Sequence, residues 1–479
     1  MKRRGAVVVV LKALGVVVLL AAALILTGRF LVQPWPERAP GVVLEPARPI
    51  LREADVTPDN AYYYLRQLAQ TPATSRLDTT RFAACGVEAG TVTQLEAWVQ
   101  SMKPARAVLR SAANCANGQV PSVESFATQM PYISPFLMAA RAECVAAEQA
   151  AVAGRWDAAE ESYRVALRTA DQESHGGTVL NVLVNLAVSR IACDGLRRVA
   201  LEQQPPREFL DHMGALLAEL DAGQDSFAEC IRYEYLCWQN SLPEFYNAPL
   251  EMFSLGDGQT RADGGWKRVL AKPLLWLAGS SPERTLEHMA AASSQMILIA
   301  DAERFPRQRL MSVMPMLRPD GILQTVGYLT DDGVGRILVS LLLPAMDNSL
   351  ERFFGQRAVL RGTRCVLAIR GYELARGRVP ERLEELVPEW LAALPEDPFA
   401  VVPAPMRYVV ADGEWKVYSL GVDGVDHRAR YDGLSQSERA HHGDACDLVM
   451  GLNEPSRRCA DYEKSLRQPA VGLSCPARN

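Results

Sequence analysis

An unbroken apolar run near the N-terminus constrains this 479-residue chain more than any other feature of its sequence. The run extends over residues 5–27, follows Lys2, Arg3 and Arg4, and contains one charged residue, Lys12. As a helix, about 23 residues would be roughly 34 Å long, which suffices to cross a bilayer. Lys12 is near enough to the basic end for its ammonium group to reach the headgroups. We therefore expect the run to bind the membrane as a transmembrane helix.

The basic residues before the apolar run predict its orientation. By the positive-inside rule, residues 1–4 stay in the cytoplasm and the chain after Arg29 lies on the other side of the membrane. A cleaved signal peptide is the alternative, but the run is long for a signal peptide and no clear small-x-small cleavage site follows it. We therefore predict that residues 1–30 form a cytoplasmic tip and a single-pass signal anchor.

The overall charge argues against nucleic acid as a partner. The chain has a formal net charge of -5 and concentrates no basic residues beyond the first few. Proteins that bind nucleic acid use basic surfaces to release the counterions of the phosphate backbone. Because 48% of the residues are hydrophobic and 22% are charged, the composition instead indicates a globular body with a large core.

Ten cysteines in an exported chain would meet an oxidising compartment, where disulfides form. The cysteines fall into two groups by their sequence surroundings, but the sequence does not determine which cysteines are paired. Cysteines in polar surroundings are the expected bridge partners, and cysteines within helical patterns are expected to be buried as small hydrophobic residues. The first group is Cys85, Cys115, Cys446, Cys459 and Cys475, and the second is Cys144, Cys193, Cys230, Cys237 and Cys365.

Prolines separate the anchor from the body. Residues 31–57 are rich in proline and show little periodicity, which predicts an extended stalk. Thr57 followed by Pro58 is typical of an N-cap and a first helical position. The tyrosines of residues 62–64 could form an aromatic binding platform, but we interpret them as packing residues of the helix that follows.

Apolar residues recur at helical spacing through residues 58–345, which we expect to be a helical region. Between Pro135 and Ala170 they predict a helical hairpin with a turn at Gly154, and the spacing is similar to one tetratricopeptide repeat. No second copy follows in register, so we favour a plain helix pair within a bundle. Further helices are predicted near 93–103, 104–113, 178–203, 207–221, 225–241, 266–278 and 282–303, and a loop at 243–265.

One predicted helix carries charges near an otherwise apolar face. Glu229 and Glu234 could in principle act as an acid/base pair. No histidine or metal motif accompanies them, and Arg232 lies between them. We therefore interpret these residues as a solvated or salt-bridged helix face.

The segment from Cys365 to Asp426 has the clearest local pattern. A long helix over about 347–376 should end at Gly377, which suits the left-handed C-cap position. A short helix between Pro380 and Pro388 should turn Leu383, Leu386 and Val387 inward. The rest of the pattern predicts a rigid corner at Asp397-Pro398-Phe399, strands at 406–411 and 414–420 around Asp412-Gly413, and a last strand near GDACDLVM.

These residues resemble a known family. The order GRVPERLEELVPEWLAALPEDPF, then MRY, then WKVYSLGVDGVD is similar to the globular end of the major pseudopilin of type II secretion. The layout of the whole chain is similar to a group of uncharacterised, membrane-anchored bacterial envelope proteins. The resemblance implies a bacterial inner (cytoplasmic) membrane protein. It also implies a small α+β module within residues 346–450, followed by a polar tail at 451–479.

The same resemblance implies a calcium site. Pseudopilins commonly hold calcium in the acidic loop after the second strand, and oxygen ligands on a flexible loop suit this ion. The matching residues are Asp423 and Asp426, joined by Asp444 and Asp447. Two features depart from the pattern: basic residues follow at 427–430, and Asp-Gly turns form without metal.

The anchor also departs from that of a pilin. A prepilin carries glutamate at the fifth mature position, whereas cleavage after Gly5 would place Val10 there. The module therefore resembles a folded cap without the filament-forming stem.

The sequence contains no Gly-x-Ser-x-Gly, His-Glu-x-x-His, Cys-x-x-Cys or phosphate-binding loop. We interpret His441-His442 as part of a polar loop, and His175, His212 and His288 as surface or helix-face residues. We therefore expect a mainly α envelope protein that acts through contacts with other envelope proteins, rather than an enzyme. Two alternatives stay open: an exported hydrolase whose active site is assembled from distant residues, and a divergent secretion-system pseudopilin.

Overall fold

The computed structural model describes most of the body of the protein. The described residues are 35–71, 92–123, 125, 128–247, 280–306, 321–411, 414–429 and 448–451, together with residues 21, 23–25 and 27 of the apolar run, which are helical. The remainder of the expected anchor lies outside the described residues, as do the helix expected at 266–278 and, apart from Gly451, the tail expected at 451–479. Membrane insertion at residues 5–27 therefore stays a prediction.

The described chain is mainly helical with one small antiparallel sheet, which confirms the expected fold class at this level. Its helices are α2 (Ala61–Leu65), α4 (Val92–Ser101), α5 (Lys103–Ala113), α6 (Ile133–Val152), α7 (Trp156–Ser174), α8 (Val179–Glu202), α9 (Arg207–Gly223), α10 (Phe227–Asn247), α13 (Pro282–Ala300), α14 (Gly321–Thr330) and α15 (Gly333–Arg376), with short 3-10 turns η1 (Glu53–Asp55), η2 (Arg66–Gln70) and η6 (Leu383–Leu386). The strands are β1 (Arg407–Ala411), β2 (Glu414–Ser419) and β3 (Leu448–Gly451).

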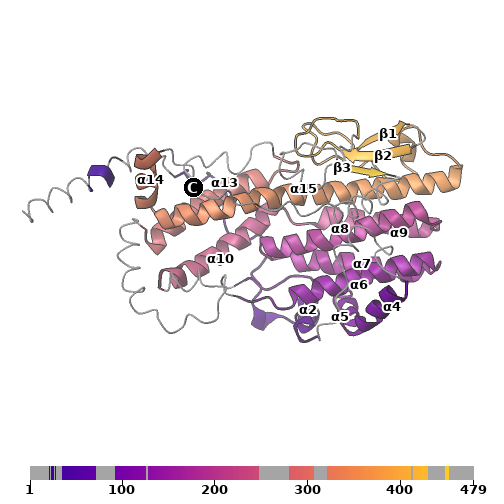
Figure 1. The fold of residues 1–479 in the computed structure, drawn as a ribbon, viewed down its shortest axis with the longest axis horizontal. Coiled ribbons are helices and arrows are strands. Elements are labelled where there is room, and N and C mark those ends of the chain that lie inside the picture. The colour runs from indigo at the N-terminus through magenta and orange to yellow at the C-terminus, as the bar shows by residue number, and fades with distance from the viewer. Residues whose placement is uncertain are drawn as a thin grey trace, which may run out of the picture.

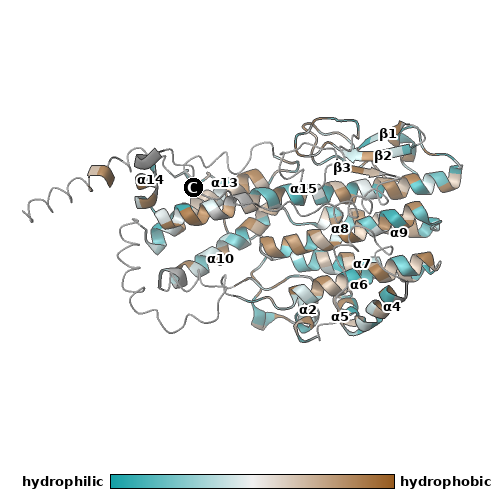
Figure 2. Cartoon of the chain, in the orientation of Figure 1, coloured by the Kyte–Doolittle hydropathy of each residue, from teal (hydrophilic) through white to brown (hydrophobic). Residues whose placement is uncertain are grey.

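The helices lie in successive layers, as Figure 1 shows. The pair α6–α7 lies beside α4 and α5, the pair α8–α9 follows, and α15 runs along the long axis between α8–α9 and the sheet. At the other end of α15, α10 and α13 extend beside its first half. Apolar and polar residues share most helices, so each layer buries one face against the next (Figure 2).

The hairpin predicted between residues 135 and 170 is present as α6 and α7. Its expected inner face is buried at Phe136, Cys144 and Ala151. Gly154 has the positive φ of 71° that a tight turn requires. In α7, Ala159 is buried and Ala158 is exposed. The pair packs within a larger stack of helices, as the plain helix-pair interpretation predicts.

The helix α8 passes a simple test for a membrane span but lies in the core. It is 24 residues long, its most apolar 18-residue window has a mean hydropathy of 1.5, and 78% of that window is buried inside the protein. Arg197 and Arg198 are buried within it. Its apolar residues are therefore explained by packing between α7 and α15.

The helix α15 is longer than the sequence pattern predicts. It begins at Gly333 rather than near 347 and continues past Pro344, so the boundary expected between residues 345 and 346 falls inside one helix. It ends where predicted: Gly377 has φ 69°, and its amide donates to the carbonyl of Glu373. Residues of α15 pack in each of three hydrophobic clusters, one among α4–α9, one with α10 and α13, and one under the sheet.

The C-terminal module matches its sequence pattern in most respects. The strands pair in the order β1-β2-β3, and Ala411 faces Glu414 across the predicted two-residue turn. Leu383 and Leu386 are buried as expected, but Val387 is exposed because it follows the last residue of η6. The buried residues of the sheet pack on Cys365 and Ile369 of α15.

The stalk interpretation is wrong for the described residues 35–57, which we call the strap. Ala39 and Leu44 are buried, and the amide of Ala39 donates to Ser294 Oγ of α13 at 2.9 Å. The guanidinium of Arg232 in α10 donates to the carbonyl of Val43 at 3.1 Å. A proline-rich segment cannot form regular backbone pairs, so side chains of α10 and α13 supply its partners.

Two local predictions need correction. The helix after the strap begins one turn later than expected: Asn60 is the N-cap, and its side chain accepts from the amide of Tyr62, while Thr57 bonds Asp59 instead. The helix expected at 225–241 extends to Asn247, into the segment expected to be a loop. Tyr62 and Tyr64 pack against the core, as predicted.

The five cysteines expected to be buried are buried and unbridged, namely Cys144, Cys193, Cys230, Cys237 and Cys365. Of the expected bridge partners, Cys115 is a free, half-buried thiol among the described residues, and the other four lie outside them.

Candidate functional site

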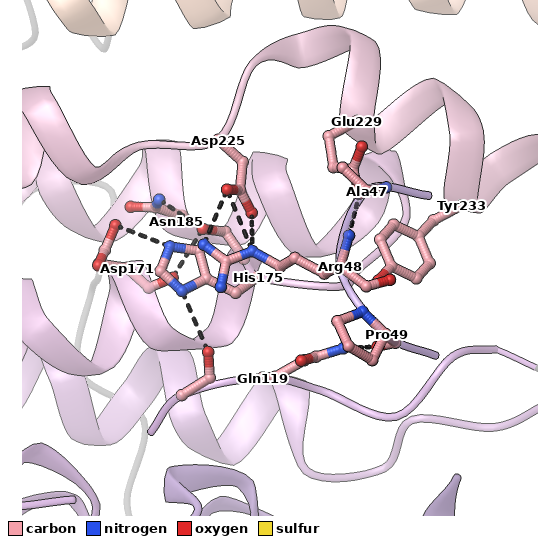
Figure 3. Close-up of polar contacts among 12 residues, drawn as sticks. Ala47, Arg48, Pro49, Gln119, Asp171, His175, Asn185, Asp225, Glu229 and Tyr233 are labelled. Carbon is pink, nitrogen blue, oxygen red and sulfur yellow. Dashed lines mark hydrogen bonds and ion pairs between the residues drawn. The ribbon is translucent and has the colours of Figure 1, made fainter. Parts of the chain in front are cut away.

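The strap is attached to the helical body most strongly at Arg48. Its guanidinium forms a fork with Asp225, which precedes α10, with Nε to Oδ2 at 2.9 Å and Nη2 to Oδ1 at 2.8 Å. Both side chains are partly buried, and Figure 3 shows them facing each other. The hydrogen bonds that Arg48 donates to the Asp225 carboxylate raise the pKa of Arg48. A two-point ion pair of this kind fixes direction as well as distance.

Glu229, one turn into α10, binds the backbone of the strap. Its Oε1 accepts from the amides of Ala47 at 2.8 Å and Arg48 at 3.2 Å, and its Oε2 accepts from Arg232 at 3.2 Å. Tyr233 donates its hydroxyl to the carbonyl of Arg48 at 3.4 Å. Residues 229, 232 and 233 share one face of α10 because of their helical spacing, and this face is dedicated to the strap.

A histidine lies beside this ion pair. His175 follows the last residue of α7; its Nδ1 lies 3.1 Å from the carbonyl oxygen of Gly118, and its Nε2 lies 3.6 Å from Asp171 Oδ1. Burial lowers the pKa of His175, but Asp171 and Asp225 outweigh that effect and raise it. The side chain is 13% exposed, so the expectation of a surface histidine is wrong here. Its nitrogens bind the loop before α6 and the end of α7, which explains its burial.

The cavity beside the Arg48–Asp225 ion pair is small. A cavity of about 10 Å³ lies among Ser174, Asn185, Asp225 and Tyr233, which is close to the volume that one water molecule needs. Gln119 binds the strap from the other side, through the carbonyl of Pro49 at 2.7 Å (Figure 3). The site therefore holds the strap against α7, α8 and α10.

The strap is also held at its first described residue. The indole of Trp35 stacks on the ring of His288, with 4.3 Å between ring centroids, and the guanidinium of Arg336 lies 4.9 Å from the indole centroid. His288 Nδ1 lies 2.7 Å from Asp332 Oδ2, and Asp332 is the N-cap of α15. His288 is therefore a partly buried packing residue on a face of α13, which fits the helix-face alternative and not the surface one. Among the three histidines, His212 is exposed as predicted.

Asp332 organises this second contact. It is fully buried, has a left-handed backbone with φ 55°, and accepts hydrogen bonds from Thr285 Oγ1 at 2.5 Å and the amide of Gly335 at 3.3 Å. Burial raises the pKa of Asp332, but hydrogen bonds from His288 and Thr285 outweigh it and lower the pKa. The carboxylate therefore joins α13 to the start of α15 at the place where the strap begins.

Glu229 and Glu234, the two carboxylates of α10 that could have acted as an acid/base pair, lie in different surroundings. Glu229 faces the strap, whereas Glu234 Oε2 accepts from the amide of Val179 at the start of α8, at 3.3 Å. The salt-bridge interpretation is confirmed for Glu229 and Arg232, at 3.2 Å. Glu234 is buried rather than solvated, so the interpretation is wrong for that residue.

Two of the four residues expected to bind calcium lie in described parts of the chain. Asp423 Oδ1 accepts from the amide of Val425 at 3.0 Å, and Asp426 Oδ1 accepts from Tyr418 at 3.0 Å and the amide of Arg428 at 2.8 Å. Each carboxylate therefore shapes its own turn. Calcium takes six to eight oxygen ligands, of which these residues offer two carboxylates.

Asp444 and Asp447, like His441 and His442, lie outside the described residues. Within the described part of the chain, no group of three or more histidine, cysteine, aspartate or glutamate side chains is arranged to hold a metal ion. Calcium binding therefore stays a prediction that rests on the resemblance.

Sequence reasoning missed Arg48, Asp225 and Asp332 as a set because they are far apart in the chain. One signal was visible: Glu229, Arg232 and Tyr233 interrupt an apolar helix face at a spacing of three and four residues. Such a polar cluster needs a partner from another segment, but helical spacing alone cannot identify that segment.

Comparison with known proteins leaves the family of the chain open. No protein-family model, no curated protein and no solved structure matches it. The resemblance to the pseudopilin module therefore stays a prediction.

Proposed function

We propose that this chain is a single-pass protein of the bacterial envelope that displays a rigid helical body and acts through contacts with other envelope proteins. The observation that carries the proposal is the attachment of the strap. Arg48 and the backbone of residues 47–48 bind Asp225 and Glu229, and Trp35 is held by His288 and Arg336. A segment bound in this way would hold the body in a fixed position relative to the anchor before it.

The C-terminal module offers the surface on which a partner would bind. β1 is an edge strand, and the segment just before it carries Val401 and Val402, which are 68% and 66% exposed. Val410 on β1 is also exposed. Exposed apolar residues beside an open strand edge favour a partner that adds a strand to the sheet. We call Val401, Val402 and Val410 the valine surface.

The proposal is tested by crosslinking in intact membranes. A photo-crosslinking residue in place of Val402 should capture a discrete envelope protein, and the same residue in place of Val152, an exposed position at the end of α6, should not. The double substitution V401E/V402E should then reduce co-purification of that protein from detergent at least tenfold. Equal capture from both positions, or no capture, would contradict a role through this surface.

The state of the N-terminus tests the anchor and separates it from a pseudopilin. We expect the mature protein to keep the whole of residues 5–27, measured by intact-mass spectrometry of membrane-purified protein. A mass that corresponds to cleavage after Gly5 would instead support the secretion-system alternative.

The His288–Asp332 pair favours a second candidate, an exported hydrolase. A histidine with Nδ1 bonded to a buried carboxylate is an arrangement that hydrolases use to activate a nucleophile with Nε2. If the pair is catalytic, H288Q should abolish hydrolysis of ester or amide substrates by the purified protein. If it only caps α15 and packs Trp35, H288Q should lower stability, and the purified protein should show no hydrolysis for it to abolish.

A further inference from the structure

A cleft of about 520 Å³ lies between α10, the start of α8 and the segment that leads into α6. Its walls come from the start of α6, the start of α8 and the middle of α10, and they include Met130, Ile133, Val179 and Leu180. Leu180 is 46% exposed and lies on the wall of the cleft, where a bound apolar ligand would cover it. The volume lies within the range of small-molecule sites.

One acidic group lies in this wall, whose other polar groups are the hydroxyls of Ser125, Thr128, Ser134 and Thr178. Glu234 is 9% exposed and lines the cleft together with Cys237, one turn further along α10. One of its oxygens accepts from the amide of Val179 at 3.3 Å. Within the described chain, no lysine, arginine or histidine forms an ion pair with Glu234, in contrast to the neighbouring Glu229. Burial raises the pKa of Glu234 to about 7, because the carboxylate has no counter-charge there.

Buried carboxylates in folded proteins are normally paired, because an unpaired charge loses its hydration without compensation. The second oxygen of Glu234 is not among the fully buried unbonded atoms, so it faces the cleft. A ligand that carries a cation would supply the missing partner, and its apolar part would cover Met130, Ile133 and Leu180.

We propose that this cleft binds a small apolar molecule that carries a protonated amine, with the ammonium at Glu234. The chemistry of the wall favours this class of ligand over others. An anion would be repelled by the carboxylate, and a divalent metal would need more carboxylate ligands than the single one among the described residues of the lining. A neutral alcohol would cover the same apolar side chains but would form only a neutral hydrogen bond, which is weaker than a charge-assisted one.

The test compares two probes of the same shape on the full-length protein in detergent. Cyclohexylmethylamine is protonated at pH 7.5, and cyclohexylmethanol is its uncharged counterpart. Binding is measured by ligand-observed NMR. We expect the amine to bind the native protein at least tenfold more tightly than the alcohol. E234Q should remove that preference and leave the alcohol unchanged, whereas E208Q, at an exposed position on α9, should keep it.

A second variant keeps the test decisive if E234Q does not fold, as judged by circular dichroism. L180W places a larger side chain in the cleft without changing Glu234, and it should abolish binding of both probes. The proposal is overturned if the amine shows no preference over the alcohol at concentrations up to about 10 mM. It is also overturned if folded E234Q binds the amine as the native protein does, or if L180W leaves binding unchanged.

Discussion

Arg48 and Asp225 are 177 positions apart in the chain and form a forked ion pair with contacts of 2.8 and 2.9 Å. The pair closes the strap onto the N-terminal end of α10, where Glu229 binds the adjacent backbone. Their separation means that the strap cannot be held in place until α10 has formed.

The first prediction concerns this ion pair. Arg48→Met keeps the aliphatic stem but removes the charge, which leaves Asp225 partly buried without its partner. We expect unfolding in urea to lose about 1–2 kcal/mol, since the pair is only partly shielded from solvent. Proteolytic cleavage within the strap should accelerate. The matched control is Arg66→Met, which removes an exposed ion pair with Glu53 and should cost less than about 1 kcal/mol. Equal losses in the two variants would contradict a special role for Arg48.

The second prediction concerns pH. Glu173 is fully buried; its Oε1 accepts from Tyr132 at 2.9 Å and from Asn181 at 2.8 Å, and its Oε2 has no partner. Burial raises the pKa of Glu173 from 4.5 to about 8, although both hydrogen bonds oppose the shift. The folded protein therefore binds a proton that the unfolded chain releases above pH 4.5. Stability from this group is complete below that pH and is lost as the pH rises through about 8.

The neutral variant Glu173→Gln lacks this titration and keeps an acceptor for Tyr132 and Asn181. Urea unfolding of the native protein and of E173Q at pH 5, 7 and 9 should therefore diverge, with the native protein losing stability relative to the variant as the pH rises. A constant difference between the two proteins across this range would show that Glu173 does not titrate as inferred. The control Glu219→Gln, at an exposed ion pair with Arg168, should follow the native curve.

The third prediction concerns a buried ion pair in the core. Arg198 in α8 binds Glu148 in α6 at 2.6 Å, and both side chains are at most 7% exposed. Arg198→Leu would leave Glu148 without its partner, and we expect a loss of about 3–5 kcal/mol in the free energy of unfolding. The double variant E148M/R198L should recover most of that loss, because it removes both buried charges. If the double variant is as unstable as the single one, shape rather than charge dominates at this position.

The fourth prediction concerns the corner of the C-terminal module. Asp397 is fully buried and accepts from Ser419 Oγ at 2.5 Å and from the amides of Phe399 and Leu420, each at 2.9 Å. Asp397→Ala would leave these donors unsatisfied, which should cost about 2–4 kcal/mol and lower the midpoint of thermal unfolding. The comparison is Asp423→Ala, which removes the turn bond from the amide of Val425 and a 3.7 Å contact with His427. A smaller loss for D397A than for D423A would contradict the assigned role of the corner.

The sequence predicted elements whose cause is local. Gly377 ends α15 because a left-handed C-cap favours glycine, and the two-residue turn after Ala411 follows from Asp412-Gly413. The predicted corner at Asp397 is present, but its purpose was not visible, because its carboxylate binds the end of β2 some twenty residues later. Local rules fix the shape of a turn but not its partners.

Predictions from the sequence failed for residues whose contacts come from distant segments of the chain. Residues 35–57 have no helical or strand pattern of their own, and the polar groups that bind them lie on α10 and α13. The long helix was expected to start near residue 347, yet α15 begins at Gly333 and continues through Pro344, with Val339 and Met346 buried on either side of the proline. Glu234 was assigned to a solvated face because its neighbours Glu229 and Arg232 are charged.

The participation of α15 in all three hydrophobic clusters has a consequence for how the protein is made. A chain that crosses a membrane from its N-terminal side delivers α8 and α9 first, and α15, which packs on both, arrives only after α10 and α13 have passed. Until then the side of α8 that packs on α15 lacks its partner, although α6 and α7 already cover its other side. If the chain is exported as we propose, a nascent chain stalled before Gly333 should depend on a chaperone, and release from that chaperone should coincide with the emergence of α15.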